Sequence, residues 1–185
     1  MEYYKSGRFG RITKNAIKEG FEDSLEKVLY DSMDFASLSK KKSAEYVEEV
    51  INRMEKQLGR ENTKKVLMSC GQQCCGKSWT KFTRDIKEET DTIEDFFELL
   101  NKREEPFQTS FTFNKDEKSI FINRSKCLCG LVNKAKNKFD SNLYCECSTG
   151  HFLSFFDSIF NVESIELKQS ILNGSDSCQW IVKID

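Results

Sequence analysis

The sequence predicts an α+β protein in which N-terminal helices pack on an antiparallel sheet built from two hairpins. Apolar residues recur at helical spacing through the first hundred residues, whereas after Pro106 they alternate in short runs rich in aromatic and β-branched residues. Strands therefore follow the helices as a block instead of alternating with them one by one. The 185 residues suit a helical extension over residues 1–60 followed by a cysteine-rich α+β domain over residues 61–185.

Helix signals recur along the first hundred residues. Ser43 is expected to cap a helix whose apolar residues share one face, with Gly59 as its stop. The segment 61–70 has helical spacing, and so does the segment 78–89. Asp91, with Glu three residues later, resembles a capping box and is expected to start the next helix.

Two hairpins are expected in the second half of the chain. The runs 107–113 and 119–123 are short, rich in aromatic and β-branched residues, and separated by a polar turn. The runs 162–171 and 178–184 alternate and are joined by a Gly-containing loop. A short apolar helix opening after Gly150 is expected to precede this second hairpin.

Charge and hydropathy exclude two classes of partner. The formal net charge is −1 and no half of the chain is strongly basic, which argues against nucleic-acid binding. No run of about 18 apolar residues could span a membrane. The N-terminus lacks an apolar segment of the secretory kind, so we expect a cytoplasmic protein. In that compartment the eight cysteines are expected as metal ligands, reactive thiols or buried apolar residues rather than as disulfides.

The stretch "CGQQCCGKS" contains the G-x-x-x-x-G-K-S pattern of nucleotide triphosphatases, from Gly71 to Ser78. A phosphate loop needs a strand before it and a parallel sheet around it. The residues before Cys70 have helical spacing instead, and no later apolar strand ends in an Asp suited to Mg²⁺. Nucleotide binding is thus a lesser alternative. The competing interpretation is that Gly71 and Gly76 let the backbone turn between two helices.

The cysteines offer a different interpretation of the chain. Cys127 with Cys129, and Cys145 with Cys147, are two residues apart, so each pair would point to one side of an extended backbone. Two such pairs can close a tetrahedral thiolate site, for which zinc is the default metal and an iron–sulfur cluster the alternative. The second choices as ligands are Cys70, Cys74, Cys75 and Cys178.

Other roles for these residues stay open. The cysteines can be purely structural, because free Cys is often a buried apolar residue, or they can form a redox site with a depressed thiol pKa. His151, expected at the start of its helix, is a ligand, a proton carrier or a partly exposed residue. Phe152, Phe155 and Phe156 can line an apolar ligand cavity or form ordinary core.

The last forty residues or so resemble the C-terminal half of four-vinyl-reductase-type domains. In that family a Cys is followed five residues later by Gly and a helix, and then by a strand, a second Cys, a Gly-containing turn and a third Cys before an aromatic strand. The matching residues are Cys145, Gly150, Gly174, Cys178 and Trp180. The second Cys would fall at Ser170, where this chain departs from the pattern.

The resemblance implies a fold similar to transport-particle subunits and haem-nitric-oxide domains, with an apolar pocket and, in some members, bound zinc. We therefore predict a zinc-binding, thiolate-ligated module that also binds a small apolar molecule, with a homodimer as a further expectation. A weaker likeness to bacterial amino-thiazoline-carboxylate hydrolase-like proteins implies an enzyme. A thiol- or metal-dependent enzyme, hydrolase-like or redox, is accordingly the alternative.

Overall fold

The computed structural model describes residues 7–29, 38–130, 132–133, 135 and 138–185. In these ranges the α-helices are α1 (Gly7–Lys18), α2 (Glu22–Val28), α3 (Lys40–Leu58), α4 (Arg60–Glu88), α5 (Ile93–Glu104) and α6 (Glu146–Asp157). Single 3₁₀ turns are η2 (Glu105–Phe107), η3 (Leu143–Cys145) and η4 (Ile171–Asn173). The strands are β1 (Thr109–Asn114), β2 (Ser119–Arg124), β3 (Val162–Gln169) and β4 (Cys178–Ile184).

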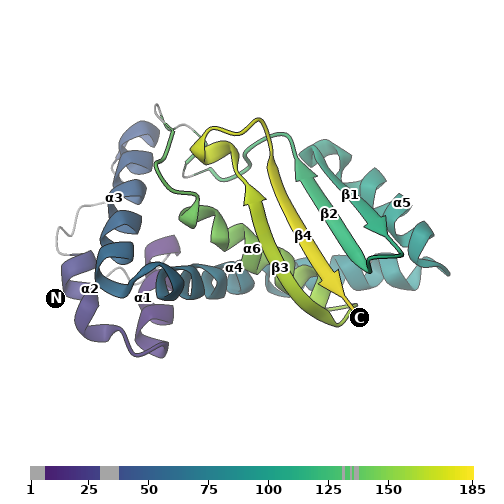
Figure 1. Cartoon of the computed structure of the whole chain (residues 1–185), viewed down its shortest axis with the longest axis horizontal. Coiled ribbons are helices and arrows are strands. Elements are labelled where there is room, and N and C mark those ends of the chain that lie inside the picture. Colours follow the sequence, from purple (N-terminus) through teal and green to yellow (C-terminus); the bar gives the residue numbers. More distant parts are fainter. Residues whose placement is uncertain (1–6, 30–37, 131, 134, 136–137) are drawn as a thin grey trace.

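The four strands form one antiparallel sheet in the order β1-β2-β4-β3. The two expected hairpins are present and are joined through β2 and β4, which places Ile122 opposite Trp180. Along β4 the buried residues alternate with less buried ones, as on a strand with one covered face. Helices α5 and α6 pack against β1 and β3 and cover that face (Figure 1). The predicted α+β fold class is confirmed.

Two helix starts differ from the expected ones by a few residues. Ser39, not Ser43, caps α3, and its hydroxyl accepts an N–H of the first helical turn at 3.4 Å. Thr92, not Asp91, caps α5, and its hydroxyl accepts the Asp95 N–H at 3.1 Å. Both capping residues have extended backbone angles, which is the conformation that brings a hydroxyl onto the free amides of a helix start.

Helix α6 begins at Glu146, before Gly150 rather than after it. Gly150 is therefore a residue of the helix interior, and His151 lies in the middle of α6 instead of at its start. A helix-interior Gly is unfavourable by about 1 kcal/mol relative to Ala, so its presence needs a packing reason.

That reason is the close approach of α4 and α6. A Cβ atom on Gly71 would lie 1.8 Å from the carbonyl oxygen of Cys147, and one on Gly150 would lie 1.9 Å from the carbonyl oxygen of Met68. Both separations are far below the distance at which nonbonded heavy atoms meet. The two backbones thus touch at a pair of residues where neither can carry a side chain.

The segment from Gly71 to Ser78 lies inside α4 and does not form a phosphate loop. A helix precedes it where a strand is required, and the strand pairs of the described residues are all antiparallel. Gly76 has φ +60°, and α4 kinks there. The expected turn between two helices is therefore a kink at Gly76 alone, whereas Gly71 is a helical contact residue.

Two hydrophobic clusters lie along α4, which runs the length of the molecule (Figure 1). The first joins α1, α2 and α3 to the first part of α4, and the second joins the rest of α4 to α5, α6 and the sheet. Cys145 packs against both clusters. Helix α4 begins at the expected division and contributes residues to both clusters, so the clusters do not separate residues 1–60 from residues 61–185. The division at residue 60 stays a prediction. Within the described residues no helix has the length and hydropathy needed to cross a membrane.

Gly71→Ala is expected to lower the free energy of unfolding by about 3 kcal/mol, because the new Cβ would overlap backbone atoms that cannot rotate away. Gly130→Ala is the matched control, since a Cβ there meets nothing within 4 Å. Urea unfolding of both variants measures the difference. Equal stabilities for the two variants would contradict the close approach of α4 and α6.

Candidate functional site

A cavity of about 450 Å³ lies where the two hydrophobic clusters meet. Its walls come from α1, the kinked part of α4, the end of α5, the loop after β2, η3 with the start and middle of α6, and β4. Six of the eight cysteines line it, namely Cys74, Cys127, Cys129, Cys145, Cys147 and Cys178. Segments far apart in the sequence thus bring most of the cysteine sulfur atoms to one cavity.

The four cysteines predicted first as ligands reach this cavity from different local structures. Cys127 and Cys129 lie in the loop after β2. Cys145 ends η3, and Cys147 lies in the first turn of α6, so the extended backbone expected for this pair is wrong. Residues two apart on a helical backbone point in different directions. Consistent with this, the Cys145 thiol contacts Ser170 and the Cys147 thiol contacts Arg8.

The second-choice cysteines divide into two groups. Cys74 and Cys178 line the cavity, whereas Cys70 and Cys75 are buried in the first and second hydrophobic cluster, respectively. Burial raises the pKa of the Cys70 thiol and of the Cys75 thiol to about 11. These two cysteines are therefore neutral core residues at neutral pH.

Ser170 lies between two of the cavity cysteines. Its hydroxyl oxygen is 2.9 Å from Cys145 Sγ and 4.0 Å from Cys178 Sγ, and it accepts the Leu172 N–H at 3.0 Å. Ser170 is the position at which the family resemblance expected a cysteine. The three residues aligned with that thiol pattern are thus neighbours in this fold.

Among the described residues no group of three or more His, Cys, Asp or Glu side chains is arranged to hold a metal ion. Gathering the four first-choice thiols around zinc or an iron–sulfur cluster would require their side chains to turn toward one another. Metal binding at Cys127, Cys129, Cys145 and Cys147 stays a prediction.

Two arginines that the sequence did not single out also line the cavity. Arg8, on α1, donates a hydrogen bond to Cys147 Sγ. Arg124, at the end of β2, has its guanidinium carbon 5.1 Å from the centroid of the Phe152 ring and donates from Nε to Thr109 Oγ1 at 3.0 Å. Arginine is usually exposed, so only its tertiary contacts reveal this role.

A buried carboxyl group faces the same cavity. Glu104, the last residue of α5, is 4% exposed, and its Oε1 atom has no hydrogen-bond partner in the described part of the chain. Burial raises the pKa of Glu104 while Arg124 opposes the shift, and burial lowers the pKa of Arg124 while Glu104 opposes it. The two groups therefore influence each other electrostatically.

The apolar wall of the cavity is aromatic. The His151 ring lies 5.6 Å from the Trp79 ring, 5.7 Å from that of Phe152 and 6.3 Å from that of Phe155, measured between centroids, and all four residues line the cavity. Phe156, by contrast, is fully buried in the second cluster and lies outside the cavity lining. One face of α6 thus serves the cavity and another serves the core.

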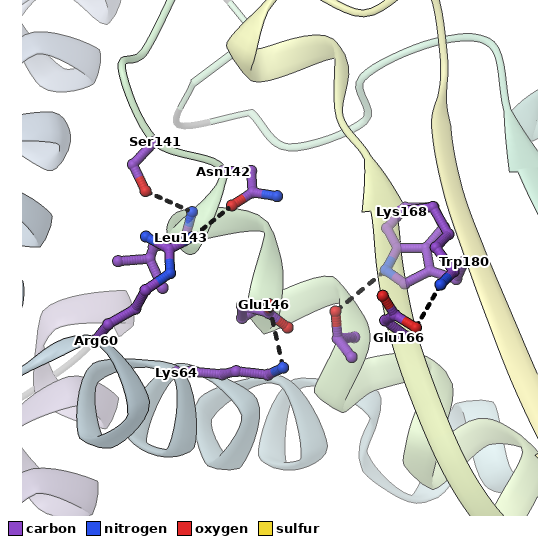
Figure 2. A network of polar contacts seen from close by, with 10 residues as sticks. Arg60, Lys64, Ser141, Asn142, Leu143, Glu146, Glu166, Lys168 and Trp180 are labelled. Atoms are coloured by element: carbon purple, nitrogen blue, oxygen red, sulfur yellow. Dashed lines mark hydrogen bonds and ion pairs between the residues drawn. The ribbon is translucent and has the colours of Figure 1, made fainter.

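Polar contacts hold α6 on both sides. Lys64 Nζ of α4 lies 3.8 Å from the Glu146 carboxylate at the helix start (Figure 2). On the sheet side, Trp180 Nε1 donates to Thr149 Oγ1 at 3.1 Å. Together with the glycine contacts, these bonds fix the helix that carries Cys147 and His151.

A family model described as a family of unknown function (DUF6144) matches residues 10–184. The chain belongs to this family. No curated protein matches it. The resemblance to four-vinyl-reductase-type domains stays a prediction, because the matching family carries no such description.

Two solved structures are similar to this chain. One is an H-NOX protein from S. oneidensis in the Fe(II) ligation state, a triple mutant, at 14% identity and a TM-score of 0.49, covering 96% of this chain and 94% of that chain. The other is an H-NOX protein from S. oneidensis in the Fe(II)NO ligation state, at 12% identity and a TM-score of 0.48, covering 96% and 97%.

Protonation of His151 is expected to oppose folding. Burial, helped by Arg124 and Arg8, lowers the pKa of His151 from 6.5 to about 4. As the pH falls, His151 of the unfolded chain binds a proton before His151 of the folded chain does. The contribution of neutral His151 to stability is therefore fully present above its pKa in the unfolded chain, and it is lost as the pH drops toward its pKa in the folded chain. Between pH 7 and pH 5, the free energy of unfolding of the wild-type protein should fall by about 2 kcal/mol more than that of the His151→Phe variant. Urea unfolding at each pH measures this, and identical pH profiles would contradict it.

Proposed function

We propose that this protein is a small-molecule-binding module whose ligand occupies the cavity between the two hydrophobic clusters. The cavity itself carries the proposal: about 450 Å³ of space, lined by aromatic rings and thiols with a few charged side chains among them. This composition and size are typical of sites that bind small organic molecules. The glycine contact of α4 with α6 holds the walls in place, so the ligand meets a largely preformed site.

The state of the thiols favours binding over thiol catalysis. Burial raises the pKa of Cys127, of Cys145 and of Cys147, although Ser170 opposes the shift at Cys145 and Arg8 opposes it at Cys147. Since the thiolate is the nucleophile and the metal ligand, thiols kept neutral suit an apolar wall. A thiol-dependent enzyme, hydrolase-like or redox, would need the opposite shift.

Zinc binding has its own test. If Cys127, Cys129, Cys145 and Cys147 turn to hold the ion, elemental analysis of the purified protein should give about one zinc per chain. A thiol count should then show at least six fewer reactive thiols before unfolding than after, because the buried Cys70 and Cys75 are protected together with the four ligands. Cys145→Ser should release the metal, whereas Cys70→Ser, in the core, should not. Metal-free protein with an intact fold would contradict zinc binding and leave the small-molecule proposal standing.

Ligand binding can be followed by intrinsic fluorescence, because both tryptophans of the chain, Trp79 and Trp180, line the cavity. We expect small aromatic molecules such as phenol to cause a saturable change in tryptophan emission. Ser148→Phe should abolish it, since the larger side chain would fill the cavity that Ser148 lines. Ser110→Phe, on the exposed side of β1, is the matched control.

Two results would contradict the proposal. One is the absence of any saturable change in the folded wild-type protein. The other is a change that survives Ser148→Phe, which would place the bound molecule somewhere else.

A further inference from the structure

The strongest unexplained feature of the cavity is the unpaired oxygen of Glu104. A buried carboxyl oxygen without a donor destabilises the folded protein, and such groups are rare in native proteins. Of the buried side-chain atoms that lack a partner in the described residues, only those of Arg8 and Glu104 belong to residues that line the cavity. Glu104 thus brings a carboxyl group to the ligand site, and its buried Oε1 atom has no donor among the described residues.

Arg124 lines the same cavity and has hydrogen-bond donors that no described residue accepts. Its Nε is engaged by Thr109, and no acceptor for its two terminal nitrogens is found in the described part of the chain. The Phe152 ring lies alongside the guanidinium and restricts its plane. A guanidinium with two free terminal N–H groups matches a carboxylate, which it can bind through two parallel hydrogen bonds.

Glu104 and Arg124 are near enough to affect each other's charge, yet no ion pair joins them in the described residues. A ligand group that accepts hydrogen bonds from Arg124 and donates one to Glu104 would satisfy both. A carboxylate with a hydroxyl or ammonium on the adjacent carbon has this arrangement of acceptors and donor.

The remaining cavity wall, beside the two charged groups, consists of aromatic rings. Trp79, Phe155 and His151 line the cavity beside Arg124 and Glu104, and the lowered pKa of His151 makes its ring neutral at pH 7. Arg8 and Arg124 against Glu104 leave one excess positive charge, which also favours a carboxylate.

We propose that the ligand is an aromatic carboxylic acid with a hydrogen-bond donor on the carbon next to the carboxylate, that is, an aromatic 2-hydroxy or 2-amino acid. The carboxylate binds the terminal nitrogens of Arg124, the donor binds the Glu104 carboxylate, and the ring packs among Trp79, His151 and Phe155. This proposal rests on the binding function proposed above and names the ligand class of the same cavity.

Fluorescence titration with four related probes tests it. 3-Phenyllactate and phenylalanine carry both groups, 3-phenylpropanoate lacks the donor, and 2-phenylethanol lacks the carboxylate. At least one of the first two should bind at least about tenfold more tightly than either of the others, because a missing partner leaves a buried charged group unsatisfied. Comparison of phenyllactate with phenylalanine tells whether the donor is a hydroxyl or an ammonium.

Variants assign the contacts. Glu104→Gln should weaken the donor-bearing acids about tenfold and leave 3-phenylpropanoate unchanged, whereas Glu105→Gln, exposed and adjacent, should change neither. Arg124→Lys should weaken the three carboxylates but not 2-phenylethanol, with the exposed Arg84→Lys as control. Thermal unfolding of each variant without a probe shows whether it is folded. If one of the two site variants does not fold, the other still tests its own contact.

The outcomes separate the two proposals. If all four probes bind equally and Ser148→Phe abolishes their binding, the protein binds small molecules but the ligand class is wrong. The ligand class is also wrong if Glu104→Gln leaves the preference for the donor-bearing acids unchanged. If no probe binds the folded wild-type protein, both proposals are overturned.

Discussion

The contact between the backbones of α4 and α6 at Gly71 and Gly150 is the constraint on which the rest of the structure depends. Helix α4 contributes to both hydrophobic clusters, so whatever packs against its middle sets how the two clusters meet. Because both helices lack a side chain at the crossing, α6 approaches until carbonyl oxygens occupy the space of the missing Cβ atoms. Cys147 and His151, one turn apart on α6, are thereby placed along one wall of the cavity.

Burial determines which side chains of the cavity carry a charge. Burial keeps the thiols of Cys145 and Cys147 protonated and the His151 imidazole neutral, so two guanidinium groups and one carboxyl group dominate the local electrostatic field. Buried charges are unfavourable when they lack partners. Among the described residues the hydrogen-bond partners are incomplete: a sulfur for Arg8, a hydroxyl for Arg124 and none for one oxygen of Glu104. Folding has already removed these charged groups from water. A bound molecule that completes their hydrogen bonds therefore gains the interaction energy without a further desolvation cost on the protein side.

Much of the fold could be predicted because its elements follow local patterns. The change of period after Pro106 and the two alternating hairpins gave the antiparallel sheet, while the helix starts were displaced because several polar residues near each start can act as caps. The G-x-x-x-x-G-K-S match misled because a sequence pattern does not distinguish a Gly that contacts phosphate from a Gly that contacts another helix. Only the tertiary contact of Gly71 decides between them.

The site was less predictable than the fold. The gathering of the C-x-C cysteines could be anticipated, but Arg8 and Arg124 belong to a chain in which 32% of residues are charged, and no spacing marks them. Glu104 did leave a signal that was missed: it follows Phe97 by seven residues and Leu100 by four, which places a carboxyl group on the apolar face of α5. The most direct test of the account is a nuclear Overhauser measurement on the folded protein. It should show cross-peaks from the α protons of Gly71 to the amide proton of His151, and from those of Gly150 to the α proton of Met68. A folded protein without these cross-peaks would contradict the helix contact that shapes the cavity.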